Sequence, residues 1–162
     1  RNMRYKKRGI PFGDLLREAI WQPALAQKSM ATFISAFPNP AFLILCYPVI
    51  TMGKQTHPGS ADNLLGKKAP AEGRRRLSLE YWVTENYPPH FFLWNSEADE
   101  LVPPVNSELL AKALRDNGIP HEYVRYKTGA HGIGLGTGTE CEGWFELAVA
   151  FWEQNRKQMV ME

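Results

Sequence analysis

Three short apolar segments, separated by amphipathic stretches, constrain the fold of this chain most strongly. They cover Phe42–Cys46, His90–Trp94 and Glu122–Tyr126. The first two are apolar on both faces, as in strands buried within a parallel sheet, and the third alternates like a strand nearer an edge. Helical patterns follow the second and third segments, so the chain alternates strand, helix, strand, helix. We therefore expect an α/β fold, a three-layer parallel sheet with flanking helices.

The helical patterns have recognisable ends. Asn106 or Ser107 is the expected N-cap of the helix between the last two strands, and Asn117-Gly118 is its expected stop. One apolar face is expected for the closing helix, made by Trp144, Leu147, Ala148, Phe151 and Trp152.

The length of 162 residues, with 44% hydrophobic residues, fits one domain covering residues 1–162. Residues 1–23 are expected to form a basic arm and a short helix over 14–21, and a second helix is expected over 24–37. Residues 51–86 are broken by glycine and proline. We expect a loop-and-cap insertion there, with a short helix over 77–83.

The charge balance argues against a polyanionic partner. Lys and Arg number 19 against 17 Asp and Glu, a net charge of +2, and we interpret the basic run Arg74-Arg75-Arg76 as a solvated turn rather than a nucleic-acid patch. The longest apolar run, Ala41–Ile50, is too short to cross a bilayer and contains Pro48. We expect a soluble, cytoplasmic chain that binds neither nucleic acid nor membrane.

Cysteine and histidine spacing indicates no metal site, and we expect no cofactor. The glycine run after His131 has Thr137 where a dinucleotide-binding fingerprint requires its third glycine. Cys46 and Cys141 are interpreted as reduced structural thiols. A nucleophilic pair of Cys141 with His131 is a weaker alternative, because signatures of cysteine enzymes are absent.

Candidate chemistry lies in the loops that follow the second and third strands. The first loop carries Glu97, Asp99 and Glu100, and the second carries His131 between glycines. Neighbouring parallel strands lie about 4.8 Å apart, so an acid ending one strand can reach a histidine ending the next. An orienting acid and a general base are one interpretation. A helix cap and a glycine turn are the structural alternative.

Several motifs together resemble the C-terminal half of α/β-hydrolases of the acetyl esterase/lipase group, which includes xylanase B-like and acetyl-xylan esterase-like sequences. The motifs are Cys46-Tyr47-Pro48-Val49-Ile50-Thr51-Met52-Gly53, Asp99-Glu100-Leu101-Val102-Pro103 and Gly129-Ala130-His131-Gly132-Ile133-Gly134-Leu135. The resemblance runs from about residue 31 to residue 152. It implies that Asp99, rather than Glu97 or Glu100, orients His131 as the base of a catalytic triad.

The nucleophile of that family is missing from the chain. The fold places it in Gly-x-Ser-x-Gly, no such motif occurs here, and Ala24 stands where the serine should be. Four of the serines, Ser29, Ser60, Ser78 and Ser96, lack this context and are not expected to be the nucleophile. The resemblance therefore implies a carboxylic ester hydrolase in its complete form, acting on a small ester or an acetylated carbohydrate. The alternative is a truncated or degenerate, non-catalytic chain that acts in binding or assembly.

The strand at 42–46 also bears on partners. Its apolar faces suit an internal strand, and the resemblance implies a neighbour that would come from the missing N-terminal half. We therefore expect the chain to form a homo-oligomer or to dock on that half.

Overall fold

A computed structural model describes residues 42–85 and 90–159. At its centre lies a parallel sheet in the order β1-β2-β3, built from Leu43–Cys46, Phe91–Ser96 and His121–Tyr126. The strands start level, with Leu43 opposite Phe91 and Phe91 opposite His121. The three predicted strands and their parallel arrangement are thus confirmed. The helices predicted over 14–21 and 24–37 lie outside the described residues.

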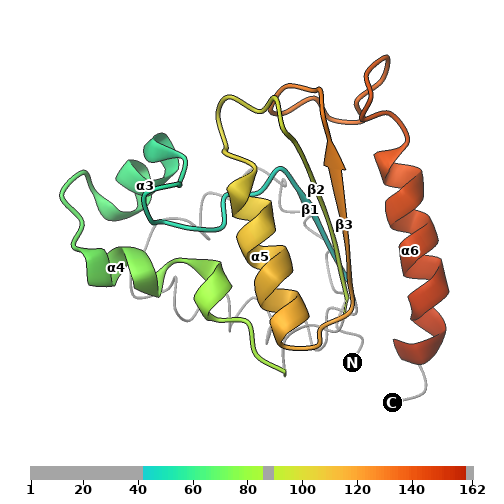
Figure 1. Ribbon diagram of the computed structural model, residues 1–162, viewed down its shortest axis with the longest axis horizontal. Helices are drawn as coiled ribbons and strands as arrows, with labels where there is room; N and C mark the ends of the chain where they lie inside the picture. The colour runs from blue at the N-terminus through green and yellow to red at the C-terminus, as the bar shows by residue number, and fades with distance from the viewer. Residues whose placement is uncertain (1–41, 86–89, 160–162) are drawn as a thin grey trace, which may run out of the picture.

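Two helices cover opposite faces of the sheet, α5 (Val105–Asp116) and α6 (Trp144–Met159), as Figure 1 shows. Alternate residues of β2 point to the two layers. Phe91 and Leu93 pack in the core beneath α5, whereas Phe92 and Trp94 pack in the core beneath α6. This two-sided burial explains why the segment is apolar throughout, and it confirms the predicted three-layer α/β fold.

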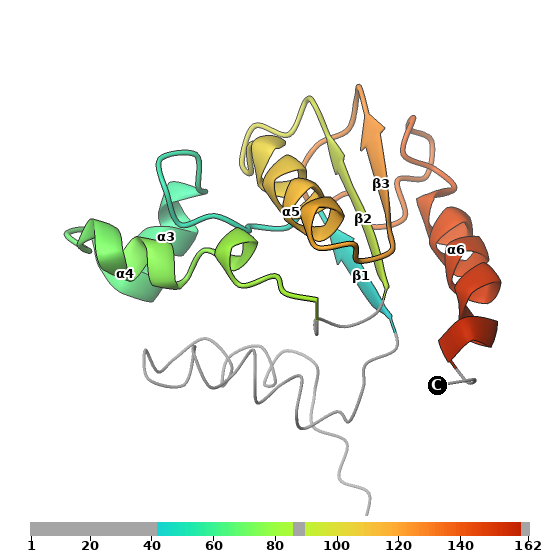
Figure 2. The same cartoon turned by 60° about the horizontal axis from the view of Figure 1, so that its bottom comes forward.

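Residues 51–85 form α3 (Pro58–Leu65), α4 (Ala71–Arg76) and the 3₁₀ turn η1 (Leu79–Tyr81). Figure 2 shows α3 and α4 beside one another, away from the sheet. The short helix predicted over 77–83 is confirmed only in part: α4 ends at Arg76, and the single 3₁₀ turn η1 is the helical segment within that range. The Ser78 hydroxyl donates to the Arg74 carbonyl at 2.8 Å and accepts from the Met52 amide at 2.8 Å. A side chain bonded in this way competes with continued helix.

The three arginines occupy the last turn of α4 rather than a loop turn, although Arg75 and Arg76 are exposed to solvent as predicted. Cations are favourable at this end of a helix dipole. Arg74 also donates to the Met52 carbonyl at 3.2 Å, and the Arg75 guanidinium lies 3.9 Å from the centre of the Tyr81 ring. The side chains of Arg74 and Arg75 therefore tie α4 to neighbouring parts of the segment 51–85.

Helix α5 begins at Val105 with Pro104 as its N-cap residue, so the prediction of Asn106 or Ser107 as the cap is wrong. Asn106 is fully buried, and its Oδ1 accepts from the amides of Ile50 and Thr51, both at 3.0 Å. The side chain therefore ties the segment after β1 to α5. The helix stops at Asn117 as predicted.

The apolar face predicted for the closing helix is only partly right. Trp144 and Ala148 are buried and Phe151 packs against the same core. Leu147 and Trp152 are 50% and 39% exposed and lie at the flanks of this narrower stripe. None of the helices in the described ranges is long and apolar enough to span a membrane.

Candidate active site

The structure brings Asp99 and His131 together. Both lie in loops at the carboxyl end of the sheet, after β2 and β3 (Figure 1). The distance from His131 Nδ1 to Asp99 Oδ2 is 2.8 Å. Glu97, from the same loop as Asp99, pairs instead with Arg125 at 2.9 Å. Hydrogen-bond reach between the predicted acid and the predicted base is therefore confirmed.

The two oxygens of Asp99 serve different partners. Oδ1 accepts from the amides of Leu101 and Val102, both at 2.9 Å, and so closes the turn that leads into α5. Oδ2 faces His131, and the side chain is only 1% exposed. The turn-forming and histidine-orienting interpretations of Asp99 are thus compatible, because each uses its own oxygen.

The imidazole of His131 is partly open to solvent, with 27% of the side chain exposed. A carboxylate at Nδ1 keeps the proton on that nitrogen and leaves a lone pair on Nε2. The Tyr47 ring packs against the imidazole, with 4.6 Å between ring centres. A histidine oriented in this way can accept a proton at Nε2.

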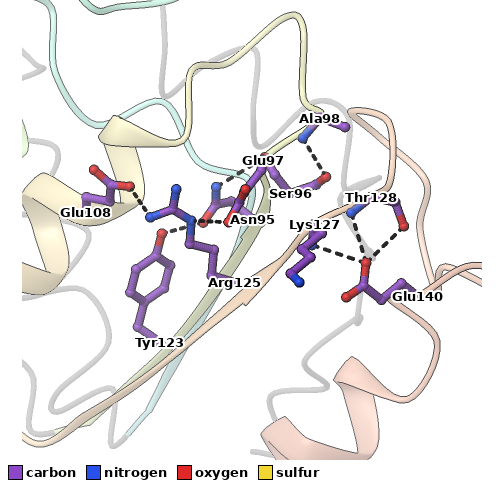
Figure 3. Close-up of polar contacts among 10 residues, drawn as sticks. All are labelled: Asn95, Ser96, Glu97, Ala98, Glu108, Tyr123, Arg125, Lys127, Thr128 and Glu140. Atoms are coloured by element: carbon purple, nitrogen blue, oxygen red, sulfur yellow. Dashed lines mark hydrogen bonds and ion pairs between the residues drawn. The ribbon is translucent and has the colours of Figure 1, made fainter.

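Glu140 joins the two ends of the loop that carries His131 (Figure 3). These ends, residues 127–129 and 140–141, form the neck of the loop. One oxygen of this carboxylate accepts from the Lys127 amide at 3.2 Å and from the Thr128 amide and hydroxyl at 3.0 Å. Hydrogen bonds from Thr128, above all from its amide, hold the pKa of Glu140 below its ordinary value of 4.5. The carboxylate is therefore charged at neutral pH and anchors both chain ends of the loop.

Close packing at the neck requires glycine at position 129. Its φ is +125°, a conformation that other residues rarely adopt. A Cβ there would lie 2.8 Å from Cys141 Sγ and 3.2 Å from Ile133 Cδ1. The glycine flanking His131 thus has a steric reason, beyond the loop flexibility that the sequence indicated.

The alternative pairing of Cys141 with His131 is wrong. The Cys141 side chain is buried, and Sγ donates to the Thr128 carbonyl at 3.2 Å. Burial is the main cause that raises the pKa of this thiol above 9.0, which keeps it protonated at neutral pH. Burial likewise raises the pKa of Cys46. Cys141 therefore acts as a packing residue of the neck.

Three of the serines considered in the sequence, Ser60, Ser78 and Ser96, have structural partners. Ser60 bonds His57 Nδ1 at 2.9 Å at the start of α3, Ser78 ends α4, and Ser96 Oγ accepts from the Ala98 amide at 3.1 Å (Figure 3). Ser29 lies outside the described residues, as does Ala24. Among the residues that the structure describes, Asp99 is the hydrogen-bond partner of His131, through Nδ1. No described serine is hydrogen-bonded to this imidazole.

Polar contacts on the α5 side hold the carboxyl ends of β2 and β3 in register (Figure 3). The Tyr123 hydroxyl donates to Asn95 Oδ1 at 2.6 Å. Burial raises the pKa of Tyr123 to about 12, with a further contribution from the charge of Glu108. Arg125 joins Glu97 to Glu108, the latter at 2.8 Å. The strand ends that carry the two site loops are thus fixed to each other and to α5.

Sequence reasoning did not identify Tyr47 or Glu140 as parts of this site. The position of Tyr47 directly after β1 was an available signal, since strand ends at this edge gather functional groups. Glu140 had no comparable signal, because its partners lie across a closed loop. In the described ranges, no three His, Cys, Asp or Glu side chains group as metal ligands.

Comparison with known proteins places the chain in a family. Residues 51–158 match the model of the prolyl oligopeptidase family, a family of α/β-hydrolases. The chain belongs to this family. A curated relative, endo-1,4-beta-xylanase B of Butyrivibrio fibrisolvens, is 41% identical over 106 residues, which are 65% of this chain and 16% of the relative.

Solved structures support the same placement. An acetyl ester-xyloside bifunctional hydrolase from Caldicellulosiruptor lactoaceticus is 34% identical, with a TM-score of 0.67, over 71% of this chain and 42% of that one. The carboxylesterase Cest-2923 from Lactobacillus plantarum WCFS1 shares the fold at 22% identity, with a TM-score of 0.60, over 85% of this chain and 54% of that one. The chain thus resembles esterase-type α/β-hydrolases and spans about half or less of each.

Proposed function

We propose that this chain carries the acid and the base of a serine-dependent carboxylic ester hydrolase. The observation that carries the proposal is the 2.8 Å contact between His131 Nδ1 and the buried carboxylate of Asp99. The contact lies at the carboxyl end of the sheet, where β2 and β3 end. A buried acid that fixes the tautomer of a partly exposed histidine is the arrangement a nucleophilic serine requires.

In the proposed reaction, Nε2 of His131 accepts the proton of a serine hydroxyl while the serine oxygen attacks the carbonyl carbon of the ester. Asp99 stabilises the imidazolium, which then donates its proton to the departing alkoxide. Water repeats the sequence on the acyl-enzyme, releasing the carboxylic acid and restoring the serine.

The serine is proposed to come from outside this chain, which has no Gly-x-Ser-x-Gly. Among the described residues, β1 is the outer strand of the sheet and pairs with β2 along one of its two long sides. A further parallel strand along the other long side would end beside Tyr47, whose ring contacts His131. We therefore propose that the half carrying the nucleophile docks along β1, and a second copy of this chain is the alternative occupant.

The substrate class is proposed from the relatives. One is described as an acetyl ester-xyloside hydrolase and another as a xylanase. Small acetyl esters, including acetylated carbohydrate, are therefore the proposed substrates. A non-catalytic role in binding or assembly is the second candidate, and the absence of the nucleophile motif favours it.

Hydrolysis of p-nitrophenyl acetate separates the two candidates. The assay compares this chain alone with the same chain extended by its upstream coding region, each with and without His131→Ala. The proposal expects activity only in the extended form and its loss in the variant. Inactivity of the extended form, or activity that survives His131→Ala, would favour the non-catalytic role.

Light scattering during size-exclusion chromatography tests the docking proposal. A complex with the upstream half, or a dimer of this chain, is the expected result. A monomer that shows no association with the upstream half would contradict it.

A further inference from the structure

Tyr47 has an unusual backbone conformation. With φ at +40°, it is the one non-glycine residue in the described ranges on the positive side of φ. For a bulky side chain this conformation is a genuine outlier, and it strains the backbone. Such strain persists only where surrounding contacts impose it, and it concentrates at functional sites.

Contacts on both sides of Tyr47 impose this conformation. Its amide donates to the Trp94 carbonyl at 2.7 Å, which extends the pairing of β1 and β2 by one bond. Pro48 follows, where the chain leaves the sheet. The strained residue is therefore the turning point between β1 and the segment that α5 holds through Asn106.

The Tyr47 ring contacts both a buried tryptophan and the imidazole. The ring lies edge-on to Trp94, with ring centres 5.0 Å apart and planes at 86°. Trp94 is fully buried and packs on Trp144 at 5.3 Å. The Tyr47 ring also contacts the His131 ring, with 4.6 Å between ring centres and the planes at 62°. A continuous series of aromatic contacts thus runs from the core to the imidazole.

This contact supplies a restraint that Asp99 alone does not. A single hydrogen bond at Nδ1 fixes one corner of the imidazole but leaves rotation about that bond. A ring packed against the imidazole limits this rotation and so fixes the direction in which Nε2 points. Small misplacements of a reacting group cost large factors in rate.

We propose that Tyr47 is a positioning residue, held in a strained turn so that its ring sets the orientation of His131. This inference rests on the proposed function, in which Nε2 is the basic atom. The aromatic ring, rather than the hydroxyl, carries the role. Tyr47→Phe therefore keeps the restraint. Tyr47→Asn removes it with a residue that tolerates positive φ.

The first test uses the chain itself and does not depend on activity. Nuclear magnetic resonance follows hydrogen exchange of the His131 Nδ1 proton, and tryptophan fluorescence confirms that each variant is folded. We expect Tyr47→Phe to match the parent and Tyr47→Asn to exchange about tenfold faster or more. Equal exchange in all three proteins would overturn the proposal. If Tyr47→Asn fails to fold, Tyr47→Leu replaces it, because it also lacks a ring.

The second test uses the extended protein and p-nitrophenyl acetate. We expect Tyr47→Asn to lower kcat by about tenfold or more with little change in KM, and Tyr47→Phe to restore kcat. Equal kcat in both variants would overturn the role of Tyr47 while leaving the esterase proposal intact. An inactive parent would instead refute the esterase proposal, and the exchange measurement would still decide whether Tyr47 restrains the imidazole.

Discussion

Replacing Asn106 by alanine should destabilise the chain more than any exposed substitution on the same helix. The side chain of Asn106 makes four hydrogen bonds of 3.0 Å. Its Oδ1 accepts from the backbone amides of Ile50 and Thr51, and its Nδ2 donates to the carbonyls of Gln55 and Pro103. Alanine leaves the first two donors buried without an acceptor. Each such group costs about 1–3 kcal/mol, so we expect a loss of about 2–6 kcal/mol. That is a large share of a typical domain stability of about 5–15 kcal/mol.

Urea denaturation followed by tryptophan fluorescence measures this loss. Asn117→Ala is the matched control, because Asn117 ends the same helix but is exposed, with a single side-chain bond to the Ala113 carbonyl at 2.9 Å. We expect the control to cost less than about 1 kcal/mol. Asn106→Asp keeps the acceptor for both amides but places a buried carboxylate oxygen against the carbonyls of Gln55 and Pro103, so it should also destabilise the chain by more than the control. A cost below about 1 kcal/mol for Asn106→Ala would refute the argument that this side chain holds the segment after β1.

Three further measurements test the neck of the His131 loop and the strand ends. Since hydrogen bonds lower the pKa of Glu140 below 4.5, its clamp should be complete at neutral pH and be lost as pH falls through that lowered value; Glu140→Ala should speed exchange of the two amides it binds, whereas Glu142→Ala, in the same loop, should not. The pKa of Tyr123 of about 12 predicts that one tyrosine ionises late in an ultraviolet titration and that this late signal is absent in Tyr123→Phe. Because the folded state holds the phenol proton more tightly than the unfolded state, the stability of the parent should fall as pH rises above 10. Cys46 and Cys141, whose pKa values burial raises, should resist a disulfide reagent at neutral pH until urea unfolds the chain; rapid reaction of native Cys141 would revive the thiol nucleophile.

The parts of the fold that the sequence predicted are those that local pattern controls. Strand β2 is apolar on both faces because alternate residues enter different cores, and the Asn117 stop uses local turn chemistry. Asp99 and His131 were predicted to meet because parallel strands deliver their loops to one edge. Each of these inferences needs only neighbouring residues and the order of the elements.

The parts that the sequence did not predict depend on contacts between distant residues. Asn106 is of a residue type that favours helix caps and stands near the start of α5, but its side chain bonds Ile50, which lies 56 positions away. Tyr47 carries no signal for a positive φ, since that conformation is imposed by contacts with Trp94. Leu147 fits an amphipathic pattern yet remains half exposed, because the core beneath α6 accepts a narrower stripe.

Asp99→Asn in the extended protein tests most directly whether Asp99 orients His131 as a base. Asparagine keeps an acceptor for the amides of Leu101 and Val102, so the turn is retained. Its other atom becomes a donor towards His131 Nδ1, which moves the imidazole proton to Nε2 and removes the base. We expect kcat for p-nitrophenyl acetate to fall by about 10⁴-fold with little change in the urea midpoint. A kcat within about threefold of the parent would contradict the account and leave Asp99 with the turn alone.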